Sequence, residues 1–230
     1  MAFNNVASVA DSIPVRRALV SVYDKTGLEE LVRGLLREAP GIEFYSTGGT
    51  YEAIGAALSS LGPAAAAARL VAVSDYTGQP EMAGGLVKTL DWKIYLGLLA
   101  ETGNASHAAD LDRLGAKPFD LVVGNLYPFA EAAGDASSPV EALRQRIDIG
   151  GPAMIRAAAK NFLRVASVSD PGQYGGLLEE LRIARGATRL EFRRRLAASA
   201  FDRISRFDRL VADRLAGIGP EALAAAYSTI

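Results

Sequence analysis

The chain has 230 residues, of which 50% are hydrophobic and 22% are charged. A chain of this length and composition can bury a full core, which excludes disorder as its main state. Lys and Arg number 25 against 26 Asp and Glu, and this balance gives no electrostatic footprint for nucleic acid. The absence of Cys and the single histidine, His107, exclude disulfides, thiol nucleophiles and Cys- or His-rich metal sites.

Nothing in the sequence predicts a membrane anchor or an exported protein. No apolar run approaches the roughly 20 residues that a membrane-spanning helix needs. Residues 1–16 are polar and irregular and lack the basic start and apolar core of a signal peptide. We therefore expect a flexible N-terminal arm over 1–16, a cytoplasmic location, and no membrane partner.

Short apolar runs alternate with segments of helical spacing along the chain. The runs predict strands over 17–23, 42–46, 70–73, 120–127 and 165–169. The spacing of apolar residues predicts helices over 28–36, 51–58, 139–146 and 153–160, the last beginning at Pro152, and mostly helix from 174 onward. Strands that alternate with helices indicate an α/β fold with a parallel sheet.

Two of the predicted strands end in small hydroxyl residues and glycines, over 21–27 and 46–50. Ligands of open α/β sheets bind beyond the carboxyl ends of the strands, and backbone N–H groups at helix N-termini bind anions. Lys25 adds a positive charge there, and Ser46 and Thr50 add hydroxyl groups. The two turns together favour a phosphate site over ordinary strand-to-helix turns.

Four further residues carry chemistry, and each also has a purely structural interpretation. Lys88 lies in a glycine-rich loop, where a solvated lysine is common. Tyr127 follows a strand and could cap the core with its ring. Asp148 lies between two isoleucines, so it is either a partly buried acid or the N-cap of the next helix. Lys160 is near the C-terminus of a predicted helix, where a positive charge suits the helix dipole.

Seven segments together resemble one enzyme family, in the order in which that family has them. They are Asp24–Gly27, Ser46–Thr50, Tyr76–Met82, Lys88–Leu90, Asn125–Phe129, Ile147–Pro152 and Arg156–Asn161. In these segments the chain resembles the inosine monophosphate (IMP) cyclohydrolase domain of the bifunctional purine-biosynthesis enzyme. The resemblance implies a three-layer, methylglyoxal-synthase-like α/β sandwich over 17–215 with a C-terminal helical extension. It leaves 216–230 as a tail, and it implies that the formyltransferase domain is absent.

The family closes the pyrimidine ring of a formamido-imidazole-carboxamide ribotide with loss of water, without cofactor or metal. By matching motifs, Asp148 would accept the proton of the attacking carboxamide nitrogen. Lys160 and Tyr127 would stabilise and protonate the formyl oxygen, and Lys88 would help to hold the carboxamide or the developing charge. The resemblance places further residues around the ribotide: Ser21, Lys25, Thr26, Ser46, Gly48, Gly49 and Thr50 on the ribose-phosphate side, and Asn125, Ile149 and Gly150 on the base side. It also implies that Thr89 binds the substrate.

The sequence departs from the family pattern at five positions. Leu86 stands where the family has an arginine that would meet the phosphate, Asp91 and Tyr95 replace histidines, Trp92 replaces a proline, and Tyr23 replaces a serine. Two alternatives to IMP formation therefore remain: a paralogue that closes a related heterocycle in nucleoside secondary metabolism, and a nucleotide-binding module without turnover. The family also implies a homodimer, and a separate formyltransferase is a conceivable partner.

Overall fold

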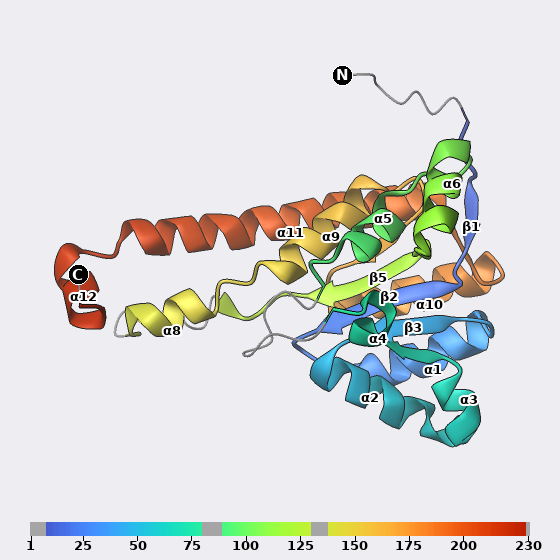
Figure 1. The fold of residues 1–230 in the computed structure, drawn as a ribbon, viewed down its shortest axis with the longest axis horizontal. Coiled ribbons are helices and arrows are strands. Elements are labelled where there is room, and N and C mark those ends of the chain that lie inside the picture. Colours follow the sequence, from blue (N-terminus) through green and yellow to red (C-terminus); the bar gives the residue numbers. More distant parts are fainter. Residues whose placement is uncertain (1–7, 80–88, 130–137, 229–230) are drawn as a thin grey trace.

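The computed structural model describes residues 8–79, 89–129 and 138–228. Five parallel strands form the central sheet in the order β4-β3-β2-β5-β6 (Figure 1). Their bounds are β2 (Arg17–Val22), β3 (Glu43–Ser46), β4 (Leu70–Ala72), β5 (Leu121–Asn125) and β6 (Ala166–Val168). The α/β fold with a parallel sheet is confirmed, and all five predicted strands are present.

Helices cover both faces of the sheet, which makes the fold three-layered. In β2, Ala18, Val20 and Val22 pack into one core cluster and Leu19 into the other, as the alternation of a strand requires. The first face is covered by α1 (Leu28–Glu38), α2 (Gly48–Leu58) and α10 (Tyr174–Ile183), and the second by α5 (Trp92–Leu99), α9 (Gly150–Lys160) and α11 (Leu190–Ala216). Short elements complete this part: η1 (Ser59–Leu61), α3 (Pro63–Ala67), α4 (Val73–Thr77), α6 (Ala105–Leu114) and η3 (Pro171–Gln173).

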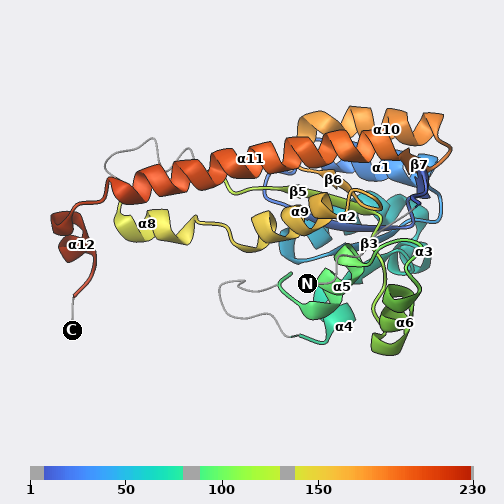
Figure 2. The same cartoon turned by 90° about the horizontal axis from the view of Figure 1, so that it is seen from above.

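A helical extension projects from one end of the sheet. The second half of α11 runs past the strands, beside α8 (Val140–Gln145) and towards α12 (Pro220–Ala226), in both views (Figures 1 and 2). Phe129, Leu143 and Phe207 form a small separate core where α8 meets α11. No helix in the described parts of the chain has the length and hydropathy to cross a bilayer.

Three expectations about element boundaries were wrong. The arm over 1–16 is too long, because β1 (Ser12–Pro14) pairs antiparallel with β7 (Ala187–Arg189). Helix α9 begins at Gly150 rather than at Pro152, and α2 begins at Gly48 rather than at residue 51. Both helices therefore start on glycines, so their first N–H groups face the end of the sheet without a side chain in the way.

One buried arginine fastens the N-terminal strand to the rest of the fold. Arg193 of α11 is fully buried. Its guanidinium donates to the carbonyl oxygens of Asp11 (3.0 Å), Ala10 (3.1 Å), Phe162 (2.9 Å), Leu163 (3.1 Å) and Thr188. Burial lowers the pKa of Arg193 to about 10, so the group stays charged at neutral pH.

We expect Arg193→Met to lower the free energy of unfolding by about 3 kcal/mol, because it leaves five carbonyl groups, of which that of Thr188 is buried, without their guanidinium donor. Arg194→Met on the exposed side of the same helix removes an ion pair with Glu191 and should cost at most about 0.5 kcal/mol. Urea unfolding of the two variants measures the difference. Equal stabilities would contradict the role of Arg193.

Candidate functional site

A large groove lies beyond the carboxyl ends of β2, β3 and β5, with a volume of about 1640 Å³. The N-termini of α2 and α9 and one face of α11 enclose it. Eleven of the fifteen predicted site residues line it: Ser21, Lys25, Gly48, Gly49, Thr50, Thr89, Asn125, Tyr127, Asp148, Ile149 and Gly150. The parallel sheet thus brings together segments that are far apart in the sequence.

One end of the groove can hold an anion. Helix α2 begins at Gly48, and its N-cap residue, Thr47, makes no side-chain capping bond. The side chain of Lys25 lies over this first turn, because a Cβ added at Gly49 would be 3.7 Å from Lys25 Nζ. Free N–H groups, a helix dipole and an ammonium group therefore converge on one point.

The hydroxyl groups predicted to bind phosphate serve a different purpose. Ser46 is fully buried, outside the groove lining, and its hydroxyl donates to the carbonyl of Val20 at 2.8 Å. Thr50 donates to the carbonyl of Val22 at 3.0 Å and accepts from its N–H at 3.2 Å. Both side chains fasten α2 and β3 to β2, so neither has a proton left for a ligand.

Thr26 also lies outside the groove lining. It is exposed, and its N–H donates to Asp24 Oδ1 at 2.9 Å. This short-range bond shapes the turn that leads into α1. The turn, rather than the Thr26 side chain, contributes to the site, because it sets the position of Lys25.

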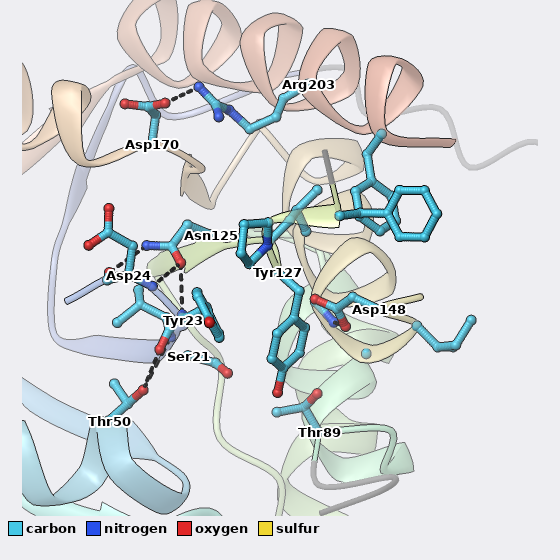
Figure 3. A pocket seen from close by; sticks show the side chains of 18 of the residues that line it. Ser21, Tyr23, Asp24, Thr50, Thr89, Asn125, Tyr127, Asp148, Asp170 and Arg203 are labelled. Atoms are coloured by element: carbon cyan, nitrogen blue, oxygen red, sulfur yellow. Dashed lines mark hydrogen bonds and ion pairs between the residues drawn. The ribbon is translucent and has the colours of Figure 1, made fainter. Parts of the chain in front are cut away.

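The amide of Asn125 joins the ends of two neighbouring strands. Its Oδ1 accepts from the N–H groups of Tyr23 (2.7 Å) and Asp24 (2.9 Å), and its Nδ2 donates to the carbonyl of Asp24 at 2.7 Å (Figure 3). Asn125 lines the groove as predicted, and these three bonds use its amide oxygen and one of its two N–H groups. Its role in this chain is to hold the loop after β2.

Asp148 is partly buried at the N-terminus of α9. The N–H of Gly151 donates to its Oδ1 at 3.0 Å, so Asp148 does cap the helix, one residue before the N-cap position. Burial raises the pKa of the Asp148 carboxyl above its ordinary value, while the N–H groups of Gly151 and Tyr127 oppose the rise. A capping role and a role as a proton acceptor are both compatible with this position.

Tyr127 and Thr89 face Asp148 across the groove. Tyr127 follows β5 with its ring half exposed, and its hydroxyl points toward Thr89 (Figure 3). Thr89 is buried, and a Cβ added at Gly150 would be 3.2 Å from its hydroxyl oxygen. A proton acceptor, a phenol and a threonine hydroxyl therefore surround the same part of the groove.

Two of the four predicted catalytic residues are not placed in this groove. Lys88 lies outside the described residues, although its neighbour Thr89 lines the groove. Lys160 is exposed at the C-terminal end of α9, ten residues from Gly150, which corresponds to about 15 Å along a helix. Within one chain, the position of Lys160 does not support a role beside Asp148.

Helix α11 forms one wall of the groove, and no sequence motif predicted it. Several α11 residues line the groove: Ser199, Asp202, Arg203, Arg206, Phe207 and Leu210. Arg203 forms an ion pair with Asp170, and Arg206 pairs with Asp202 at 2.6 Å. The spacing of 199, 203, 206 and 210 is that of one helix face, but a polar face is also typical of a helix exposed to water.

We expect Gly151→Ala to displace the Asp148 carboxyl, because the added Cβ would overlap Oδ2 and lie 3.1 Å from Cγ. A carboxyl moved into water should regain an ordinary pKa, so its pKa should fall, as measured by carboxyl ¹³C NMR titration. Gly176→Ala on α10 is the matched control, since nothing lies within 4 Å of its added Cβ. An unchanged Asp148 pKa in Gly151→Ala would refute the packing argument.

Comparisons with known proteins agree with this geometry. The AICARFT/IMPCHase bienzyme family model matches residues 158–229. Bifunctional purine biosynthesis protein PurH from Mesorhizobium japonicum is 46% identical over 198 residues, which are 86% of this chain and 35% of that protein. Its counterpart from Dinoroseobacter shibae is 45% identical over 222 residues, 95% of this chain and 40% of that protein. This chain therefore spans little more than a third of these relatives.

A solved structure matches at nearly full length. The crystal structure of ForH superposes with a TM-score of 0.71 at 32% sequence identity, and the match covers 87% of this chain and 99% of ForH. The motifs and the sequence identity lead to the same group of proteins. The chain belongs to the AICARFT/IMPCHase family, in which it corresponds to the IMP cyclohydrolase domain.

Proposed function

We propose that the groove binds 5-formamidoimidazole-4-carboxamide ribotide and closes its pyrimidine ring to give IMP and water. One observation carries this proposal: the groove joins an anion-binding helix N-terminus, with Lys25, to a partly buried carboxylate, Asp148. A ribotide has a phosphate at one end and a reacting base at the other. The two ends of the groove match those two chemistries.

The proposed chemistry begins with attack of the carboxamide nitrogen on the formyl carbon. A C–N bond forms, Asp148 takes the proton from the nitrogen, and the carbonyl electron pair moves to the formyl oxygen. The phenol of Tyr127 donates a proton to that oxygen. Loss of this hydroxyl together with the proton of the formamido nitrogen releases water and gives the aromatic ring. The proton that Asp148 took returns through solvent to the Tyr127 phenolate, which restores both groups.

The position of Asp148 suits a proton acceptor. Burial raises its pKa toward the range in which a carboxylate is a stronger base, while the N–H of Gly151 keeps the group in place. Holding both reacting groups of one substrate side by side removes much of the entropic barrier to ring closure. The groove therefore needs only to hold the formamido and carboxamide groups together and to transfer protons.

A second candidate function is closure of a related heterocycle by a paralogue. The observation in its favour is Tyr23, which lines the groove where the family has a serine. Incubating the chain with the ribotide and, separately, with its nucleoside distinguishes the candidates. We expect the mass of the ribotide product to show the loss of one water. Closure of the nucleoside alone would favour the paralogue. Nucleotide binding without ring closure would favour a binding module.

We expect Asp148→Asn to lower the turnover of ring closure by about 10²–10⁴-fold, because the amide keeps the helix cap but accepts no proton. The raised pKa means that Asp148 favours folding while protonated, and this contribution is lost as pH rises through the folded pKa. The variant should therefore unfold at the same temperature as the parent protein at pH 7.5, or higher. Near-normal turnover would remove Asp148 from the mechanism.

The acid side of the pH profile gives a second readout of the same group. Since Asp148 must be ionised to accept a proton, kcat/KM should fall as pH drops through its raised pKa. Asn at this position should abolish that inflection. An inflection that persists in Asp148→Asn belongs to another residue.

We expect Lys25→Ala to weaken IMP binding about tenfold and to leave inosine binding unchanged, because the ammonium group contacts only the phosphate. Lys117→Ala is the matched control: this lysine pairs with Glu43 at 3.9 Å and lies outside the groove lining. Isothermal titration of both ligands measures the effect. Equal losses for IMP and inosine would place Lys25 at the base instead.

A further inference from the structure

Two half-exposed tyrosines meet inside the groove. Tyr23 and Tyr127 are 52% and 48% exposed, and their ring centroids lie 4.9 Å apart at an interplanar angle of 56°. Both rings line the groove. Large aromatic faces left open to water inside a groove are typical of ligand-binding surfaces.

The backbone fixes the position of Tyr23. Its N–H donates to Asn125 Oδ1 at 2.7 Å, and the adjacent Asp24 makes two more bonds to the same amide. Val22 and Asn125 are partners in the parallel register of β2 and β5, so Tyr23 and Tyr127 leave the sheet side by side. The ring pair therefore forms part of the rigid end of the sheet.

The Tyr23 ring lies beside the end of the groove that holds Asp148. In Figure 3, the Tyr23 ring lies next to that of Tyr127, which lies beside Asp148 and points its hydroxyl toward Thr89. Tyr23 is also two residues before Lys25 in the same loop, so a ligand that contacts both Lys25 and Asp148 can reach the ring pair. A serine here would offer one hydroxyl group, whereas tyrosine offers a flat apolar surface.

We propose that Tyr23 is a specificity-determining residue, which with Tyr127 forms an aromatic wall for the heterocyclic ring of a nucleoside ligand. This inference rests on the proposed function and extends it to the ligand class. Stacking on aromatic side chains tolerates different heterocycles, because every base has a π-face. With this wall, more of the ligand's affinity should come from stacking of its heterocyclic ring and less from contacts to its phosphate.

The test is the affinity of IMP and of inosine, measured by isothermal titration. We expect Tyr23→Ser to weaken both ligands by about tenfold, since the lost contact is to the ring that they share. Tyr23→Phe keeps the ring and should restore the lost affinity. Tyr227→Ser is the matched control, because Tyr227 is 39% exposed and does not line the groove.

Three results would overturn the inference. They are an inosine affinity that Tyr23→Ser leaves unchanged, a loss confined to IMP, and a failure of Tyr23→Phe to restore binding. Ring closure by the parent protein separates this inference from the proposed function. If inosine binding depends on Tyr23 but the ribotide is not closed, the inference about Tyr23 stands and the proposed function is rejected. If the ribotide is closed and Tyr23→Ser leaves kcat/KM unchanged, the proposed function stands and the inference is rejected. If the parent protein binds neither ligand, both are rejected.

Discussion

The geometry of the groove depends on one side-chain amide. Asn125 ends β5, and its three hydrogen bonds hold the loop after β2 in a single position. Without them, the N–H groups of Tyr23 and Asp24 would have only water as a partner, and the loop that carries Lys25 would be free to move. The position of the anion-binding end relative to Asp148 therefore follows from a contact between two neighbouring strands.

The starts of two helices set the other limits of the site. At α9, Gly151 leaves room for the Asp148 carboxyl, and at α2 the Lys25 side chain lies in ordinary contact distance of Gly49. In both cases the N-terminal turn of a helix faces a charged side chain. The negative charge of Asp148 suits the dipole of α9, whereas the positive charge of Lys25 creates an anion site at α2. The same local device thus serves a structural purpose at one helix and a binding purpose at the other.

Much of the fold was predictable from the sequence because its signals are local. Apolar runs such as 17–22 are long enough to identify buried strands, and the glycine-containing turns that follow mark their carboxyl ends. The parallel order of the strands then brings most candidate residues into one groove. Residue type and spacing indicated the two turns that contain Lys25 and Thr50, whereas the resemblance to the family implied most of the other candidate residues.

The remaining features of the site depend on contacts that no local pattern reveals. Ser46 and Thr50 have the right chemistry for phosphate, but their hydroxyl groups bond to backbone carbonyls of β2. Lys160 shares a helix with the groove, yet the length of α9 carries it to the far end. The contact between Tyr23 and Tyr127 joins residues about a hundred positions apart and depends on the strand register.

A structure of the protein with bound IMP tests the central claim most directly. The account predicts the phosphate at the N–H groups of the first turn of α2, within hydrogen-bond distance of Lys25 Nζ, and the hypoxanthine ring beside Tyr127 and Asp148. The wall formed by α11 offers the alternative cations, Arg203 and Arg206. A phosphate bound to those two arginines, with α2 unoccupied, would contradict the account.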